Sequence, residues 1–272
     1  MLLTRHLTPD NSPRWALDGR LLPRDLTLSM LLELPHAAII KLLEVIPATE
    51  ATSVTQLLAP LEPAHEVWAS GVTYLRSRDA RKAESTAGDV YDKVYEAERP
   101  ELFMKAAGWR VVGDGGRVRL RKDSRWNVPE PELVLVINCD LEIVGYCAGN
   151  DVSSRDIEGA NPLYLPQAKI YDGSCALGSG IVLAGVEELR DLSVNVRVLR
   201  GGEEIFAGET RTSQMKRRLE DLVAFLGRET TFPHGAFLMT GTGIVPPDSF
   251  SLQSGDTVEI IVGECRLTNR VE

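Results

Sequence analysis

Two apolar runs near the middle of the chain predict an antiparallel β-hairpin. They cover residues 133–137 and 143–146, with a polar break at 138–140 between them. The Asn and Asp in this break are typical of a turn, and each run has the length and composition of a strand. Folding the chain at the end of the break would lay Asp151, beyond the second run, roughly opposite Glu130, which precedes the first.

Two glutamates at the start of this hairpin have the spacing of one strand face. Residues i and i+2 of a strand point to the same side, so Glu130 and Glu132 should converge. With Asp151 beside them, three carboxylates would meet, and such close like charges raise one another's pKa values unless a cation neutralises them. All-oxygen ligation suits Mg²⁺, Mn²⁺ or Ca²⁺ rather than zinc. The competing interpretation is a solvated strand face, and Pro131 fits a strand start or edge.

The first 65 residues have the pattern of a small, separate N-terminal domain. Asp18 and Gly19 between two apolar stretches indicate a hairpin, and apolar spacings of three and four predict short helices over 26–33 and 37–45. Three prolines between residues 47 and 63 then mark an irregular connection. We therefore expect one domain over 1–65 and a larger one over 66–272.

The larger domain alternates between predicted strands and amphipathic helices. Glu101 and Lys105 are four residues apart, so on a helix they could form a surface pair; the alternative is a site carboxylate at Glu101. Three arginines alternate with apolar residues within 113–126, which predicts a second hairpin with the arginines on one face. That face is either solvated or forms a rim that steers anions to the pocket. Other predicted strands cover 66–69, 191–199 and 203–206, and the helices cover 75–82, 89–98 and 214–226.

Composition narrows the range of partners. The net charge of −9 argues against nucleic-acid or anionic-membrane binding, and no apolar run has the length of a membrane span. The N-terminus lacks the long apolar region of a signal peptide. Four scattered cysteines without C-x-x-C spacing are typical of free thiols in a reducing cytoplasm, which is the expected location.

Several motifs together resemble the fumarylacetoacetate hydrolase superfamily across residues 66–272. Its E-x-E-L pattern, followed about nineteen residues later by N-D, corresponds to 130–133 and 150–151, and its T-G-T loop to 240–242. Its G-K-x-x-D segment corresponds to the stretch around Lys169. The resemblance implies an α+β, β-rich fold, a mixed β-sheet roll with peripheral helices and a small N-terminal domain. It also implies a homodimer or higher homo-oligomer, and Mg²⁺ (or Mn²⁺ or Ca²⁺) on Glu130, Glu132 and Asp151.

One departure from the superfamily pattern bears on the reaction. The superfamily motif G-x-N-Y-x-x-H carries a histidine that many hydrolases use as the base for water attack, and this chain has Thr73 for the asparagine and Ser77 for the histidine. Serine is not a general base at neutral pH without a partner, so hydrolysis of a C–C bond is disfavoured. The resemblance implies substrate-binding roles for Tyr74, Ser77, Arg78 and Thr242.

Within the superfamily, the segments GVTYxRSRxAR, RPELFxKA and WNVPEPEL most resemble dehydratases of 2-keto-3-deoxy sugar acids such as 2-keto-3-deoxy-D-arabinonate. Such an enzyme binds a small 2-oxo acid, forms a metal-stabilised enolate and yields 2-oxoglutarate semialdehyde. Either Glu101 or Lys169 would be the base. The alternatives are an acylpyruvate-type or fumarylacetoacetate-type C–C hydrolase, an oxaloacetate decarboxylase, and a non-catalytic sugar-acid sensor.

Overall fold

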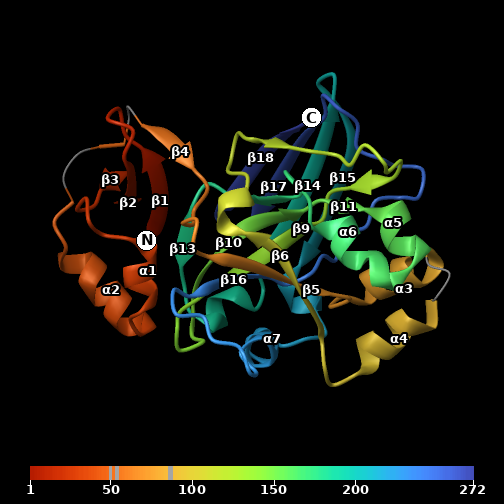
Figure 1. Ribbon diagram of the computed structural model, residues 1–272, viewed down its shortest axis with the longest axis horizontal. Helices are drawn as coiled ribbons and strands as arrows, with labels where there is room; N and C mark the ends of the chain where they lie inside the picture. The colour runs from red at the N-terminus through yellow and green to blue at the C-terminus, as the bar shows by residue number, and fades with distance from the viewer. Residues whose placement is uncertain (49–50, 53–54, 85–87) are drawn as a thin grey trace.

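A mixed sheet of eleven strands forms the centre of the described structure (Figure 1). The structure is a computed structural model that describes residues 1–48, 51–52, 55–84 and 88–272. Most neighbouring strands are antiparallel, and β16 and β5 are parallel. The main path of the sheet is β3 (Arg20–Leu21), β2 (Pro13–Leu17), β1 (Leu2–Leu7), β13 (Ile181–Leu183), β10 (Ile143–Asp151), β9 (Pro131–Ile137), β16 (Ala236–Met239), β5 (Glu66–Gly71) and β6 (Glu101–Ala107), with β12 (Cys175–Leu177) on β10 and β4 (Gln56–Leu58) on β1.

The predicted central hairpin is confirmed as β9 and β10. The two strands pair antiparallel from Ile143 opposite Ile137 to Asn150 opposite Pro131. One further bond, from the Asp151 amide to the Glu130 carbonyl at 3.0 Å, closes the open end of the hairpin. Every residue of β9 is buried, as expected for an apolar run covered on both faces. Pro131 is the first residue of β9, a position where its missing N–H is tolerated.

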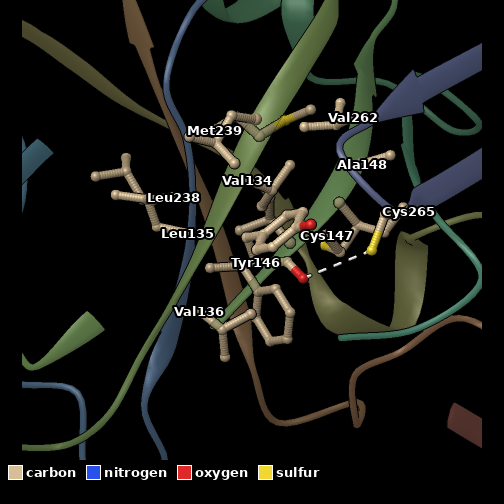
Figure 2. Packing of buried hydrophobic residues seen from close by; sticks show 14 of the residues in the cluster. Val134, Leu135, Val136, Tyr146, Cys147, Ala148, Leu238, Met239, Val262 and Cys265 are labelled. Atoms are coloured by element: carbon tan, nitrogen blue, oxygen red, sulfur yellow. Dashed lines mark hydrogen bonds between the residues drawn. The ribbon is translucent and has the colours of Figure 1, made fainter. Parts of the chain in front are cut away.

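A second sheet packs against this hairpin. Its strand order is β15 (Glu203–Arg211), β14 (Ser193–Arg200), β17 (Thr257–Val262), β18 (Cys265–Val271) and β7 (Arg117–Val118). Figure 2 shows side chains of β9, β10 and β16 gathered with Val262 and Cys265 of the second sheet. The Cys265 thiol lies 3.8 Å from the Tyr146 carbonyl oxygen. The four cysteines form no disulfide in the described chain.

The second hairpin expected over 113–126 is not formed. Only Arg117 and Val118 are in a strand there, and this strand, β7, runs parallel to β18 near the end of the chain. The next amides donate hydrogen bonds to distant carbonyls, Arg119 to Gly173 and Leu120 to Glu272. The alternation of arginine and apolar residues indicated a strand correctly, but its partner lies about 150 residues away in the sequence. A short ladder of β8 (Asn127–Val128) with β11 (Ser153–Ser154) follows.

The N-terminal residues contribute strands to the large sheet. β1 pairs with β2, β4 and β13, so the ladder continues from the N-terminal segment into residues 66–272. Figure 1 shows this segment, in red and orange, at the left of the molecule with α1 (Leu28–Leu32) and α2 (His36–Val45). The hairpin at Asp18 and Gly19 and both short helices are confirmed. A separate domain over 1–65 stays a prediction.

The remaining helices lie mostly at the opposite end of the molecule (Figure 1). The predicted helices at 75–82 and 89–98 are confirmed as the first two of this group. The helix expected from Gln214 begins five residues later, because residues 215–218 are held in a non-helical conformation: Met215 bridges to Tyr74, and the Lys216 amide donates to the Thr73 carbonyl. The helices are α3 (Leu75–Glu84), α4 (Gly88–Glu96), α5 (Arg155–Ala160), α6 (Leu165–Lys169) and α7 (Leu219–Leu226), with 3₁₀ turns η1 (Gly108–Arg110), η2 (Pro162–Tyr164), η3 (Val186–Leu189) and η4 (Thr212–Gln214). None of the helices in the described ranges is long and apolar enough to cross a membrane.

Candidate metal and active site

Three carboxylates meet at the open end of the central hairpin. Glu130 immediately precedes β9, Glu132 is the second residue of β9, and Asp151 ends β10. One oxygen from each lies within 4.8 Å of the other two, and the residues are 4%, 2% and 1% exposed. The two-residue spacing of the glutamates and the hairpin register therefore bring the predicted triad together.

Two buried lysines partly compensate this charge. Lys169, the last residue of α6, lies 2.9 Å from both Glu130 and Asp151, and Lys105 of β6 lies 2.5 Å from Asp151 Oδ1. Burial, followed by the charge of Asp151, nevertheless raises the pKa of Glu132 well above its ordinary value. Asp151 Oδ1 is shielded from solvent and accepts no hydrogen bond of good geometry from the described residues. Three buried carboxylates, with the pKa of Glu132 raised and one oxygen that accepts no hydrogen bond, fit a divalent cation.

The T-G-T loop supports the triad from the side of β16. The Gly241 amide donates a hydrogen bond to Glu132 Oε2 at 2.6 Å. Gly241 has a φ of +88°, and a Cβ there would lie 2.2 Å from Thr73 Oγ1, so only glycine fits. Thr73, at the superfamily's asparagine position, donates to the Thr240 carbonyl at 2.7 Å. Thr73 thereby holds the loop that orients Glu132.

A buried charge network surrounds Glu130, and the sequence reasoning missed most of it. Arg81 of α3 contacts Glu84, Glu130 and Glu158 at 3.0, 3.0 and 3.1 Å. Arg155, at the start of α5, is 1% exposed and lies 2.9 Å from both Glu130 and Glu158. Arg81 could have been found, because it is one helical turn after Ser77 and so shares its face. Arg155 lies in a Ser-Ser-Arg-Asp stretch, which is typical of a helix cap and does not indicate a buried ion pair.

Glu101 belongs to a strand rather than to the helix considered from the sequence. It opens β6 opposite Gly71 of β5, and a Cβ on Gly71 would lie 2.0 Å from Glu101 Oε2. Burial, and next the charge of Glu158, raise the pKa of the Glu101 carboxyl to about 7. Lys105 is fully buried against Asp151, so Glu101 and Lys105 are not a surface pair.

A small cavity lies over the triad. Among its lining residues are the predicted site residues Ser77, Glu101, Lys169 and Thr242, and its accessible volume of about 20 Å³ is roughly that of one water molecule. Tyr74 is buried near Glu132. Its burial, and next the charge of Glu132, raise the pKa of the Tyr74 phenol. Tyr74 lines a wider outer groove of about 650 Å³.

Arg78 is not brought to this cavity. Its guanidinium lies 2.6 Å from Asp79 and 3.6 Å from Asp92, and it stacks on Tyr95 at 5.1 Å. Arg81, one helical turn further, lines the cavity instead. All four histidines of the chain are in described segments, and none lines the cavity.

Known proteins resemble this chain in sequence and in structure. Residues 66–272 match the family described as fumarylacetoacetate (FAA) hydrolase C-terminal. A probable 2-keto-3-deoxyxylonate dehydratase of Haloferax volcanii is 48% identical over 210 residues, which are 76% of this chain and 72% of the relative. The 2-dehydro-3-deoxy-D-arabinonate dehydratase of Saccharolobus solfataricus is 41% identical over 212 residues, 76% of this chain and 71% of the relative.

A solved 2-keto-3-deoxy-D-arabinonate dehydratase complexed with magnesium and 2,5-dioxopentanoate has the same fold. It aligns with a TM-score of 0.84 at 32% identity, over 100% of this chain and 99% of that one. The predicted strand-rich α+β architecture is confirmed by this likeness. The chain therefore belongs to the fumarylacetoacetate hydrolase family.

Proposed function

We propose that this protein is a magnesium-dependent dehydratase that converts a 2-keto-3-deoxy sugar acid, such as 2-keto-3-deoxy-D-arabinonate, to 2-oxoglutarate semialdehyde. That product is the 2,5-dioxopentanoate of the solved relative. The two relatives are named after arabinonate and xylonate. In the D series these names describe one compound, because C2 has become a ketone, C3 a methylene, and C4 is shared. The relatives therefore support a single five-carbon substrate.

Glu130, Glu132 and Asp151 would hold the cation. When bound there, a divalent cation supplies the Lewis acidity that polarises the C2 ketone and makes the C3 hydrogens acidic. The surrounding cations, Arg81 and Lys169, line the same cavity and favour an anionic 2-oxo acid.

Lys169 is poorly suited to be the base. Its ammonium donates to Glu130 and Asp151 at 2.9 Å and to Ser153 Oγ at 2.6 Å, so all three of its hydrogens have acceptors. Burial alone would lower the pKa of Lys169, but the carboxylates of Asp151 and Glu130 raise it above its ordinary value. A lysine held as an ammonium positions carboxylates and stabilises negative charge.

Glu101 is the better candidate for proton transfer, and this observation carries the proposal. Among the described carboxylates that line the cavity, Glu130, Asp151 and Glu158 are in ion pairs, and Glu101 is in none. A carboxyl with a pKa near 7 can both accept and donate a proton at neutral pH. In its ionised form Glu101 would accept a proton from C3, and in its neutral form it would protonate the hydroxyl leaving C4.

The steps balance as follows. The electron pair of the C3–H bond becomes the C3–C4 double bond, and the C4 hydroxyl leaves as water. In a five-carbon substrate, C5 then loses one proton from carbon and one from its hydroxyl, while C3 and C4 each gain one. The result is an aldehyde at C5. No attacking water is needed, which agrees with a cavity that no histidine lines.

We also propose a homodimer or higher homo-oligomer, as the family resemblance implies, and a cytoplasmic location. The four free cysteines support a reducing compartment. Light scattering on the purified protein would measure the oligomer.

The test of the reaction is a panel of 2-keto-3-deoxy sugar acids and acylpyruvates, each incubated with and without Mg²⁺ and followed by mass spectrometry. We expect a sugar acid to lose one water only in the presence of the cation. Efficient cleavage of an acylpyruvate, with every sugar acid untouched, would show a C–C hydrolase instead. Binding without turnover of any compound would indicate a sensor.

A further inference from the structure

One oxygen of Glu130 is crowded by donors. The Ser153 hydroxyl donates to Glu130 Oε1 at 2.7 Å, and Lys169 Nζ donates to it at 2.9 Å. Guanidinium nitrogens of Arg81 and Arg155 lie 3.0 and 2.9 Å from the same oxygen. Four groups therefore share one carboxylate oxygen, which has two lone pairs and leaves no room there for a cation.

The other two carboxylates of the triad each accept one hydrogen bond. Lys169 donates to Asp151 Oδ2 at 2.9 Å, and the Gly241 amide donates to Glu132 Oε2 at 2.6 Å. In the described chain no hydrogen bond or ion pair reaches the second oxygen of Glu130 or of Glu132, and the second oxygen of Asp151 has only the Lys105 ammonium beside it, at 2.5 Å. The protein thus holds one oxygen of each glutamate and leaves the other for a cation.

We propose that Ser153 is a positioning residue that fixes Glu130 as a single-oxygen ligand and so adapts the triad to Mg²⁺ rather than Ca²⁺. The inference rests on the cation site proposed above. Mg²⁺ requires near-ideal octahedral coordination and usually takes one oxygen from each carboxylate, whereas Ca²⁺ takes six to eight oxygens and readily binds both oxygens of a carboxylate. Three carboxylates that each offer one oxygen satisfy Mg²⁺ and leave positions for a ligand, but they provide few contacts for Ca²⁺.

Ser153 holds this arrangement through a single hydroxyl. The hydroxyl accepts from Lys169 at 2.6 Å and donates to Glu130, with the Asp151 carbonyl oxygen 2.9 Å away. Ser153 is fully buried and uncharged, so its removal changes no formal charge at the site. Without the hydroxyl, Lys169 and Glu130 lose the group that sets the distance between them.

The adjacent serine is a matched control. Ser154 is equally buried, but its hydroxyl donates to Asn127 Oδ1 at 2.9 Å instead of to a triad residue. Ser153→Ala and Ser154→Ala therefore remove the same group from neighbouring positions of β11. Ser153→Thr keeps a hydroxyl at the first position and serves as the conservative variant.

The test is calorimetric titration of EDTA-stripped protein with Mg²⁺ alone and with Ca²⁺ alone, after thermal melts in EDTA establish that each variant is folded. In Ser153→Ala we expect the Kd for Mg²⁺ to rise about tenfold, the lower end for partners that orient ligands. The Kd for Ca²⁺ should rise less than about threefold, because Ca²⁺ accepts irregular coordination and is less sensitive than Mg²⁺ to a shift of Glu130. Ser154→Ala and Ser153→Thr should stay within about threefold of wild type for both ions.

Several results would overturn the proposal. These are an unchanged Mg²⁺ affinity in Ser153→Ala, an equal loss in Ser154→Ala, or equal losses for the two ions. If wild type itself binds no Mg²⁺, the proposed cation site fails and this inference fails with it. Binding by wild type with an unaffected Ser153→Ala variant refutes the positioning role alone.

Discussion

Glu101→Gln tests the proposed role of Glu101 in proton transfer. The amide keeps the shape of the side chain and removes the group that would take and return protons. Loss of one general acid–base catalyst typically costs on the order of 10²–10⁴ in rate, so we expect kcat for dehydration to fall by that factor. Glu101 is not one of the three carboxylates of the triad, so the Mg²⁺ affinity should change little.

The same substitution should stabilise the cation-free protein at alkaline pH. The pKa of Glu101 rises from 4.5 to about 7 on folding, mainly through burial, so ionising it costs free energy in the folded state. Above pH 7 the carboxylate is charged in both states and the full cost applies; below pH 4.5 it is neutral in both and the cost vanishes. At 1.36 kcal/mol per factor of ten, the cost is at most about 3 kcal/mol, and partial exposure of the residue reduces it.

Thermal melts in EDTA at pH 8 and pH 5, followed by circular dichroism, would measure this effect. For a chain of this length 3 kcal/mol corresponds to a Tm increase of about 5 °C. We expect an increase up to that size at pH 8 and little change at pH 5. Glu98→Gln, at an exposed position just before β6, is the control and should change neither Tm nor rate. Turnover within threefold of wild type, or an equal Tm difference at both pH values, would refute the role and the burial argued for Glu101.

Four further substitutions test other residues in and around the site. Glu132→Gln should weaken Mg²⁺ binding on the order of tenfold or more by calorimetry, because a neutral amide is a poorer ligand; an unchanged isotherm would remove Glu132 from the cation site. Gly71→Ala places a Cβ 2.0 Å from Glu101 Oε2 and should lower kcat about 100-fold with KM little changed; normal kcat would mean that Glu101 is placed elsewhere. Arg81→Met should cost about 3–5 kcal/mol of stability in denaturant unfolding, since it leaves three buried carboxylates short of a partner. Arg78→Ala should stay within about 0.5 kcal/mol and turn over normally, and a loss of substrate affinity there would restore the original assignment of Arg78.

The central hairpin and its carboxylates could be predicted because they depend on local periodicity. Strand alternation fixes which residues share a face, and the turn at 138–140 lays the second strand beside the first. A one-residue register shift between Ile143 and Gly145 then brings Asp151 opposite Glu130. The short helices, and β14 and β15 of the second sheet, followed from the same periodicities.

The charge network around Glu130 could not be predicted in this way. Arg81 and Glu130 are 49 residues apart in the sequence, and a basic helix is ordinarily solvated, so burial of Arg81 depends on partners from other elements. Glu101 has the same limit, because only its pairing with β5 makes the segment a strand. The late start of α7 likewise depends on a bond from Lys216 to the Thr73 carbonyl, a contact that periodicity does not encode.

Cation-dependent dehydration is tested most directly by one titration. Protein stripped with EDTA is given 2-keto-3-deoxy-D-arabinonate, Mg²⁺ is added stepwise, and 2,5-dioxopentanoate is measured after its aldehyde is trapped. We expect no product without the cation, and a rate that rises with a midpoint at or below the Kd from calorimetry, because a substrate that contacts the cation tightens its binding. Full turnover in EDTA, or saturation with Mg²⁺ and no loss of water from this substrate, would contradict the function proposed for this site.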